Sequence, residues 1–250
     1  MRSPRRVNQS LDSVRGSFTI IYRKLFEISS GDSHRKNLSP GGKRFLEFTW
    51  GSIANFTIQS SFDSSQYELF FLNIEIAAAL WVYIAVFEST LRTFLIEKLS
   101  LVYGTSDWWT IADLLSQKDF KDVKKMIGRL KSRGLDVTPT LIFENLSFSF
   151  WVELLGKQYH QKIWMKILKF FPVYPGRRED FYNKAREIRN LRNSIAHHGP
   201  IMRRNLIRDH AYLDELTAIL DPELAREVEK RSRVLDLLLN ARLVGSGGGI

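Results

Sequence analysis

The sequence predicts an all-α fold, and three observations support that prediction. Apolar residues recur at spacings of three and four through most of the 250-residue chain, as they do on one side of an amphipathic helix. Most of the seven prolines stand between these periodic segments and not inside them. The sequence shows neither an internal repeat nor a convincing pair of strands.

The expected helices follow one another along most of the chain. Residues 66–99 show the strongest helical pattern, with Glu88 and Arg92 on the polar side. Further helices are expected at residues 11–28, 118–133 (ended by Gly134), 145–155, 157–171, 178–198, 205–220 and 223–243, with shorter ones opening at Trp108-Trp109 and at Pro139. Residues 43–59 suit either a helix or an extended segment.

The most apolar stretch, residues 76–87, is bounded by Glu75 and Glu88. Spanning a bilayer takes about 20 apolar residues, so this shorter stretch predicts a buried core helix and no membrane anchor. The aromatic residues with apolar neighbours are likewise expected in the core: Trp108, Trp109, Phe148, Phe150, Trp151 and Trp164.

The positive charge is concentrated at the N-terminus. The chain carries a formal charge of +10, and residues 1–44 hold ten Lys or Arg against three Asp or Glu. Such an arm suits phosphates or an anionic surface, and a solubilising terminus fits the composition equally well. The expected organisation is a basic arm with a helix and a Ser/Pro/Gly linker at residues 1–44, a helical domain at 45–243, and a flexible Gly/Ser tail at 244–250.

Composition also excludes several kinds of chemistry. The absence of cysteine excludes disulfides and thiolate catalysis, and the five scattered histidines do not form an HExxH zinc helix. The basic residues near the start are not followed by the apolar segment of a signal peptide. We therefore expect a cytoplasmic protein without a metal ion or a cofactor.

Catalytic residue types gather on the helix expected at residues 178–198. Its core side should carry Phe181, Ala185, Ile188 and Ile195, and its opposite side Arg186, Arg189, Asn190, Asn193 and His197. Arg192 precedes His197 by five residues, roughly 140° around an ideal helix, so the two converge only at the helix end or across a second copy of the helix. A solvated basic face, with a histidine at the negative end of the helix dipole, is the alternative interpretation.

This set of residues suits RNA cleavage without a metal. Histidine can exchange a proton near neutral pH, and arginine offers a permanent forked cation for phosphate oxygens. The ribose 2′-OH would be the nucleophile, and Asn193 could hold the imidazole or a substrate oxygen. Arginines around the helix are candidates for RNA backbone contacts, with a solvated face again the alternative: Arg177, Arg178, Arg186, Arg189, Arg203, Arg204 and Arg208.

The segment from Arg192 to Ile201, RNSIAHHGPI, resembles LRNRIAHHEPI, the signature of the Abi-like (abortive-infection) branch of the HEPN superfamily. Other family elements are matched in the same order: the acid and arginine of FESTLR at 87–92, Tyr103-Gly104 with Trp108-Trp109, LSFSFW at 146–151, and the spacing of Trp164 to Phe171-Pro172. The resemblance covers residues 70–220. Ser194 and Gly199 depart from the Arg and Glu that the family commonly has, which would alter activity or substrate choice.

The resemblance implies a HEPN-type helical bundle with additional helices and a two-fold homodimer in which the Arg/His helices meet. It implies an endoribonuclease of a prokaryotic anti-phage abortive-infection or toxin–antitoxin system, with Arg192, Asn193 and His197 as catalytic residues. Glu88 would orient Arg192 or His197, or else act as a salt-bridge acid, and His198 would support the site. The alternative function is a non-catalytic HEPN protein that binds RNA or nucleotide, held by a small structured RNA or an antitoxin.

Overall fold

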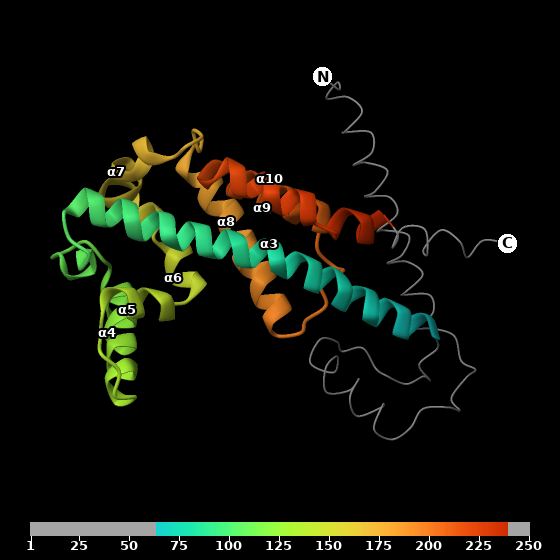
Figure 1. The fold of residues 1–250 in the computed structure, drawn as a ribbon, viewed down its shortest axis with the longest axis horizontal. Helices are drawn as coiled ribbons and strands as arrows, with labels where there is room; N and C mark the ends of the chain where they lie inside the picture. Colours follow the sequence, from blue (N-terminus) through green and yellow to red (C-terminus); the bar gives the residue numbers. More distant parts are fainter. Residues whose placement is uncertain (1–63, 240–250) are drawn as a thin grey trace. The chain divides into compact units, whose positions relative to one another are not determined.

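The computed structural model describes residues 64–239, and all regular secondary structure in that range is helical (Figure 1). The predicted all-α class is therefore confirmed for this part of the chain. The expectations for the basic arm, the helix at 11–28, the segment at 43–59 and the Gly/Ser tail fall outside the described residues.

The helices keep the expected order. The longest, α3 (Ser64–Tyr103), has 40 residues and is followed by the short 3₁₀ helix η1 (Trp108–Thr110). The helices α4 (Gln117–Ser132), α5 (Pro139–Asn145) and α6 (Phe148–Glu153) come next. After a segment of short turns, α8 (Arg178–Ala196), α9 (Leu206–Leu220) and α10 (Pro222–Arg231) complete the fold, with a last helical turn at 234–239.

By their contacts, these residues fall into two compact units. The first comprises residues 64–80, 194–207 and 233–239, and the second comprises residues 81–193 and 208–232. The helices α3 and α8 contribute residues to both units.

An aromatic cluster forms much of the core of the second unit. The ring of Trp108 stacks on Phe143 with centroids 5.2 Å apart, and Trp109 meets the same ring edge-on at 4.9 Å. Trp151 packs against Phe143 from α6 at 5.6 Å. All six aromatic residues expected in the core are buried, so that prediction is confirmed.

Capping residues explain where α4 and α5 begin and where α4 ends. Ser116 accepts a hydrogen bond from the Asp119 N–H and starts α4, and Thr138 does the same for α5, whose first residue is Pro139. Gly134 ends α4 with a positive φ of 70°, a backbone conformation that favours glycine. The cap predicted at Gly134 is confirmed.

Three of the expected helix spans are wrong. Residues 145–155 divide between α5 and α6, because Ser147 caps a new helix by accepting from the Phe150 N–H at 3.3 Å. Residues 223–243 do not form one helix, because Ser232 adopts extended backbone after α10.

The third wrong span is 157–171, which consists of four short pieces. These are η2 (Lys157–Tyr159, 3₁₀), η3 (His160–Trp164, π-helical), α7 (Met165–Ile167) and η4 (Leu168–Phe170, 3₁₀). Ile163, Trp164 and Ile167 are all buried in this segment.

The prediction that residues 76–87 form a buried core helix is right for one side of α3 and wrong for the other. Ile76, Leu80 and Phe87 are buried, whereas apolar side chains elsewhere on the helix are exposed: Phe71, Ile74, Trp81 and Val82. The helical stretch Leu69–Tyr103 is long and apolar enough to cross a bilayer by length and composition, and 28% of its most apolar window is buried within the fold.

A buried polar contact ties the turn segment to the start of α4. The Tyr159 hydroxyl donates to Asp119 Oδ2 and accepts from the Ser116 N–H at 2.9 Å. Burial, with the Asp119 hydrogen bond second, raises the pKa of Tyr159, so the hydroxyl keeps its proton at neutral pH. Asp119 itself is buried and depends on this donor and on the Ser116 hydroxyl.

Replacing Tyr159 with Phe should lower the free energy of unfolding by about 1–3 kcal/mol, because Asp119 and the Ser116 N–H would each lose a buried partner. Urea unfolding followed by tryptophan fluorescence measures the change. Tyr174→Phe is the matched control, since Tyr174 is 76% exposed, and should stay within about 0.5 kcal/mol of the wild type. Equal effects of the two substitutions would contradict this role for Tyr159.

Candidate functional site

The helix α8 carries the central residues of the predicted site. Phe181, Ala185, Ile188 and Leu191 are buried at spacings of four and three residues, which holds one side of α8 in the core. The expectation is confirmed for the first three residues. Ile195, also expected in the core, is only half-buried, and Leu191 supplies the fourth core position instead.

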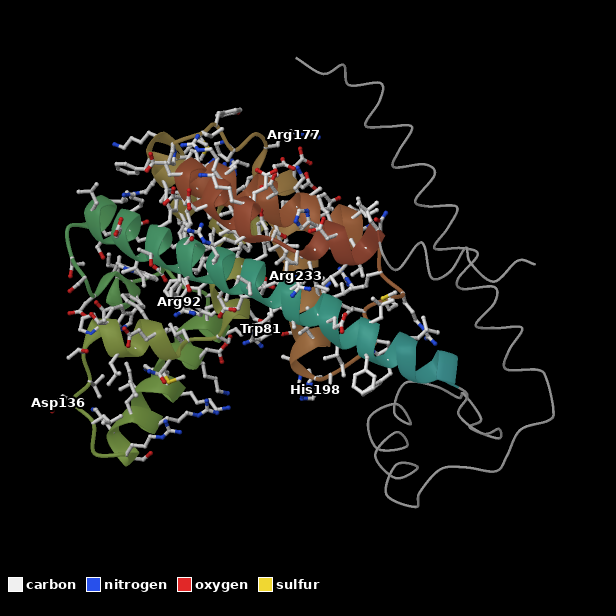
Figure 2. All side chains as sticks on the ribbon, turned by 45° about the vertical axis from the view of Figure 1, so that its right-hand side comes forward. Trp81, Arg92, Asp136, Arg177, His198 and Arg233 are labelled. Carbon is white, nitrogen blue, oxygen red and sulfur yellow. The ribbon has the colours of Figure 1, made fainter. Side chains whose placement is uncertain are left out.

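The turn after α8 places the two histidines. The helix ends at Ala196, two residues earlier than expected, because His198 adopts a left-handed conformation with φ of 55°. The His198 N–H donates to Ile195 O at 2.9 Å and the Gly199 N–H to Ser194 O at 2.7 Å, the hydrogen-bond pattern of a Schellman motif. His197 and His198 are both exposed, and Figure 2 shows His198 in this turn.

The chain beyond the turn is anchored to α3. The Ile201 N–H donates to Asn73 Oδ1 at 2.9 Å, and both residues are buried. Gly199 fits closely here, since a Cβ at this position would lie 3.1 Å from the Ser194 carbonyl oxygen. A side chain at this position, such as the Glu of the resembled motif, would require the Ser194 carbonyl to move by a few tenths of an ångström.

Arg192 lies against charged and aromatic groups of α3. Its Nε is 3.6 Å from Glu88 Oε2, and its guanidinium carbon lies 5.6 Å from the centre of the Trp81 ring. Glu88 also accepts a hydrogen bond from Arg92 at 3.2 Å, so one carboxylate faces two guanidinium groups. The side chain of Arg192 is 33% exposed and that of Glu88 17%, which leaves part of the arginine accessible to a ligand.

The other two proposed catalytic residues have fewer contacts. His197 is exposed and Asn193 half-buried, and neither side chain forms a hydrogen bond to any residue in the range 64–239. The structure thus joins Glu88 to Arg192, while the orientations of Asn193 and His197 are not set by a hydrogen bond within that range.

The candidate RNA-binding arginines differ in availability. Arg189 forms an ion pair with Glu153, which also accepts from the Tyr182 hydroxyl at 3.2 Å, so its charge is already matched. Arg186 is exposed beside the Tyr182 ring at 5.8 Å. Arg203 is exposed and Arg204 half-buried in the segment between α8 and α9. Of Arg186, Arg189, Arg203 and Arg204, four of the seven candidates, Arg186 and Arg203 are therefore the more accessible to a phosphate backbone.

No group of three or more metal-binding His, Asp or Glu side chains occurs between residues 64 and 239. The site geometry in this range therefore offers no ready set of ligands for a metal ion.

Sequence reasoning missed two residues that shape this site. Trp81 was grouped with the buried apolar run, although it is 39% exposed and faces Arg192. Asn73 lies three residues before the buried Ile76 and seven before the buried Leu80, so it shares their side of the helix. A polar residue on that side could have predicted a buried hydrogen bond.

Comparisons with protein-family models, with curated proteins and with solved structures gave no match to this chain. The resemblance to the Abi-like HEPN proteins therefore rests on the motif residues alone.

Replacing His198 with Gly should raise the free energy of unfolding by about 1 kcal/mol, because glycine adopts the left-handed conformation without steric cost. Urea unfolding measures the gain. His197→Gly is the control, since His197 is the neighbouring exposed histidine and has no positive φ. A destabilised His198→Gly variant would contradict the strain assigned to this turn.

Replacing Glu88 with Ala should destabilise the fold by about 1–2 kcal/mol, because two guanidinium groups would lose their shared, largely buried carboxylate. The double variant with Arg192→Ala should lose less than the sum of the single losses. Glu97→Ala on the same helix is the control, because Glu97 is 59% exposed and, among residues 64–239, pairs with its neighbour Lys98 alone. Strict additivity would show that Glu88 and Arg192 do not interact.

Proposed function

We propose that this chain is a metal-independent HEPN endoribonuclease of a prokaryotic anti-phage abortive-infection or toxin–antitoxin system. The observation that carries the proposal is the position of Arg192, held by Glu88 and Trp81 with its side chain still partly exposed. It lies in the last two turns of α8, and the exposed His197 directly follows the last residue of that helix. A phosphate-binding cation and a proton-transfer group are the two components that metal-free RNA cleavage requires.

In the proposed reaction, His197 removes the proton from a ribose 2′-OH, and the 2′-oxygen attacks the adjacent phosphorus. The bond from phosphorus to the 5′-oxygen breaks, and that oxygen takes up the proton that His197 removed, which gives a 2′,3′-cyclic phosphate, a 5′-OH and a neutral His197. Arg192 stabilises the negative charge of the phosphorane, and Asn193 donates a hydrogen bond to a substrate oxygen. Glu88 holds Arg192 in place, and His198 supports the site through the turn that it forms.

A two-fold homodimer is part of the proposal. The His197 side chain makes no hydrogen bond within the described range, so a second copy or the RNA would supply its orientation. Trp81 and Val82 expose apolar surface on the helix that carries Glu88, which supports an interface between copies. The proposed setting is the cytoplasm, with RNA as substrate and a small structured RNA or an antitoxin as a regulatory partner.

Purified protein incubated with total RNA in EDTA should cleave it, and both Arg192→Ala and His197→Ala should lower the rate about 10²–10⁴-fold. Gel analysis with fragment-end mapping measures the rate and the products. Arg133→Ala is the matched control, because Arg133 is an exposed arginine at the end of α4 and should leave the rate unchanged. Cleavage that persists in both site variants would refute the assignment of Arg192 and His197.

A second candidate is an RNA-binding protein without catalysis. It is favoured by the exposed His197, whose side chain lacks a hydrogen-bonding partner within residues 64–239, and by the departures at Ser194 and Gly199. Under that function the RNA in the same experiment stays intact but migrates as a complex on a native gel. Arg186→Ala and Arg203→Ala would then weaken the complex and reduce its salt dependence.

A further inference from the structure

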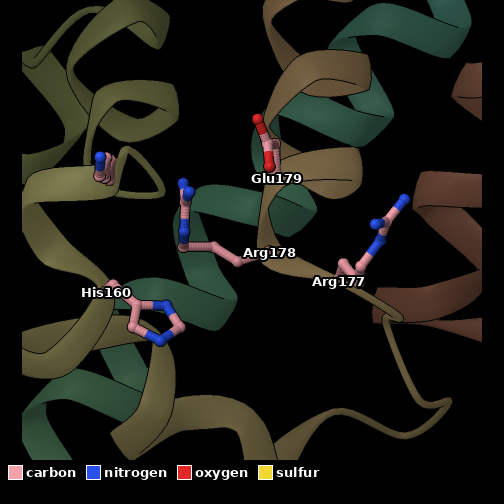
Figure 3. Close-up of a pocket in the computed structure, with 5 residues that line it drawn as sticks. His160, Arg177, Arg178 and Glu179 are labelled. Carbon is pink, nitrogen blue, oxygen red and sulfur yellow. The ribbon is translucent and has the colours of Figure 1, made fainter.

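A basic pocket lies within the second unit, at the start of α8 (Figure 3). Its volume is about 530 Å³, within the range of small-molecule sites. The lining residues are Lys157, His160, Arg177, Arg178 and Glu179. None of them belongs to the proposed catalytic set.

The charges that line this pocket are only partly neutralised. Arg177 is largely exposed and pairs with Asp180 at 3.0 Å. Arg178 donates to the Leu155 carbonyl at 2.9 Å, which holds its guanidinium in place without neutralising it. Neither Arg178 nor Lys157 forms an ion pair with an acid in the described part of the chain. The pocket therefore favours an anion.

His160 adds a hydrogen-bonding group with no partner. Its Nδ1 is buried and has no hydrogen bond, although buried polar atoms in proteins are nearly always paired. His160 is also the first residue of the π-helical turn η3, a rare conformation that is frequent at functional sites. His160 and Arg178 line the same pocket from two different segments (Figure 3).

The residue types indicate which anion fits. A phosphate group can accept hydrogen bonds from a lysine, an imidazole and an arginine at once, because its oxygens point in three directions. Glu179 would repel a bare phosphate, but its carboxylate can accept hydrogen bonds from hydroxyl groups carried beside the phosphate. Sugar hydroxyls are the simplest donors of that kind.

We infer that this pocket binds a phosphorylated sugar, with Lys157, His160 and Arg178 holding the phosphate and Glu179 accepting from a sugar hydroxyl. The site is separate from Arg192 and His197, and it does not rest on the proposed ribonuclease activity. An experiment can therefore show that the pocket does not bind a sugar phosphate without bearing on RNA cleavage, and the reverse also holds.

Isothermal titration calorimetry of the full chain with ribose 5-phosphate, at constant ionic strength, tests this inference. We expect saturable binding with a Kd of about 1 mM or lower, and no binding of ribose without phosphate. Lys157→Gln and His160→Phe should each weaken binding about tenfold. Lys169→Gln is the matched control, because Lys169 is an exposed lysine of η4 that does not line the pocket, and should have no effect.

Glu179→Gln separates the sugar contact from the phosphate contact. It should weaken binding of ribose 5-phosphate and leave inorganic phosphate unchanged or bound more tightly, because the acid opposes a bare anion. The inference is overturned if ribose 5-phosphate fails to bind, if Lys157→Gln has no effect, or if inorganic phosphate binds as tightly as the sugar phosphate. Binding of a 5′-phosphorylated RNA but not of ribose 5-phosphate would also overturn it.

Discussion

The end of α8 is the constraint on which the proposed site depends. The left-handed backbone at His198 stops the helix at Ala196 and turns the chain toward Ile201. Asn73 then holds the Ile201 N–H in a buried hydrogen bond. Because of this turn, Arg192 and Asn193 lie in regular helix, whereas His197 is the first residue after the helix and is exposed. Without the turn, α8 would continue and His197 would lie on a helix face, as the sequence had predicted.

The position of Arg192 depends on a second feature, the carboxylate of Glu88, which faces both Arg92 and Arg192. A single carboxylate with low exposure accepts from one guanidinium and lies 3.6 Å from the other. That arrangement positions Arg192 but leaves one net positive charge among the three groups, which suits a phosphate ligand. The Trp81 ring centre lies 5.6 Å from the Arg192 guanidinium carbon, close enough for a cation–π contact on the helix that also carries Glu88.

Much of the fold could be predicted from the sequence because its signals are local. Helical periodicity located α3, α4 and α9, and Gly134 and Pro139 marked a helix end and a helix start. The segment 157–171 could not be predicted as π and 3₁₀ turns, because its apolar pattern also fits one α-helix and only packing decides between them. The exposed side of α3 was missed for the same reason, since composition does not tell which face of an apolar helix is covered.

The candidate site was only partly accessible to sequence reasoning. Motif residues pointed to Arg192, Asn193 and His197, and helical periodicity placed Glu88 and Arg92 on one polar side, where the structure pairs them. The contact of Glu88 and Trp81 with Arg192 joins residues about a hundred positions apart in the sequence, and such pairing depends on tertiary packing. The basic pocket combines two segments in the same way, since Lys157 and His160 meet Arg178 across the loop before α8.

Mass spectrometry of a short RNA after incubation with the protein in EDTA tests the central claim most directly. One version of the RNA would carry a single 2′-deoxy nucleotide at the cleaved position. The account predicts a 2′,3′-cyclic phosphate and a 5′-OH from the unmodified RNA, and no cleavage at the 2′-deoxy position. Cleavage at the 2′-deoxy position, or fragments with 5′-phosphate ends, would contradict it.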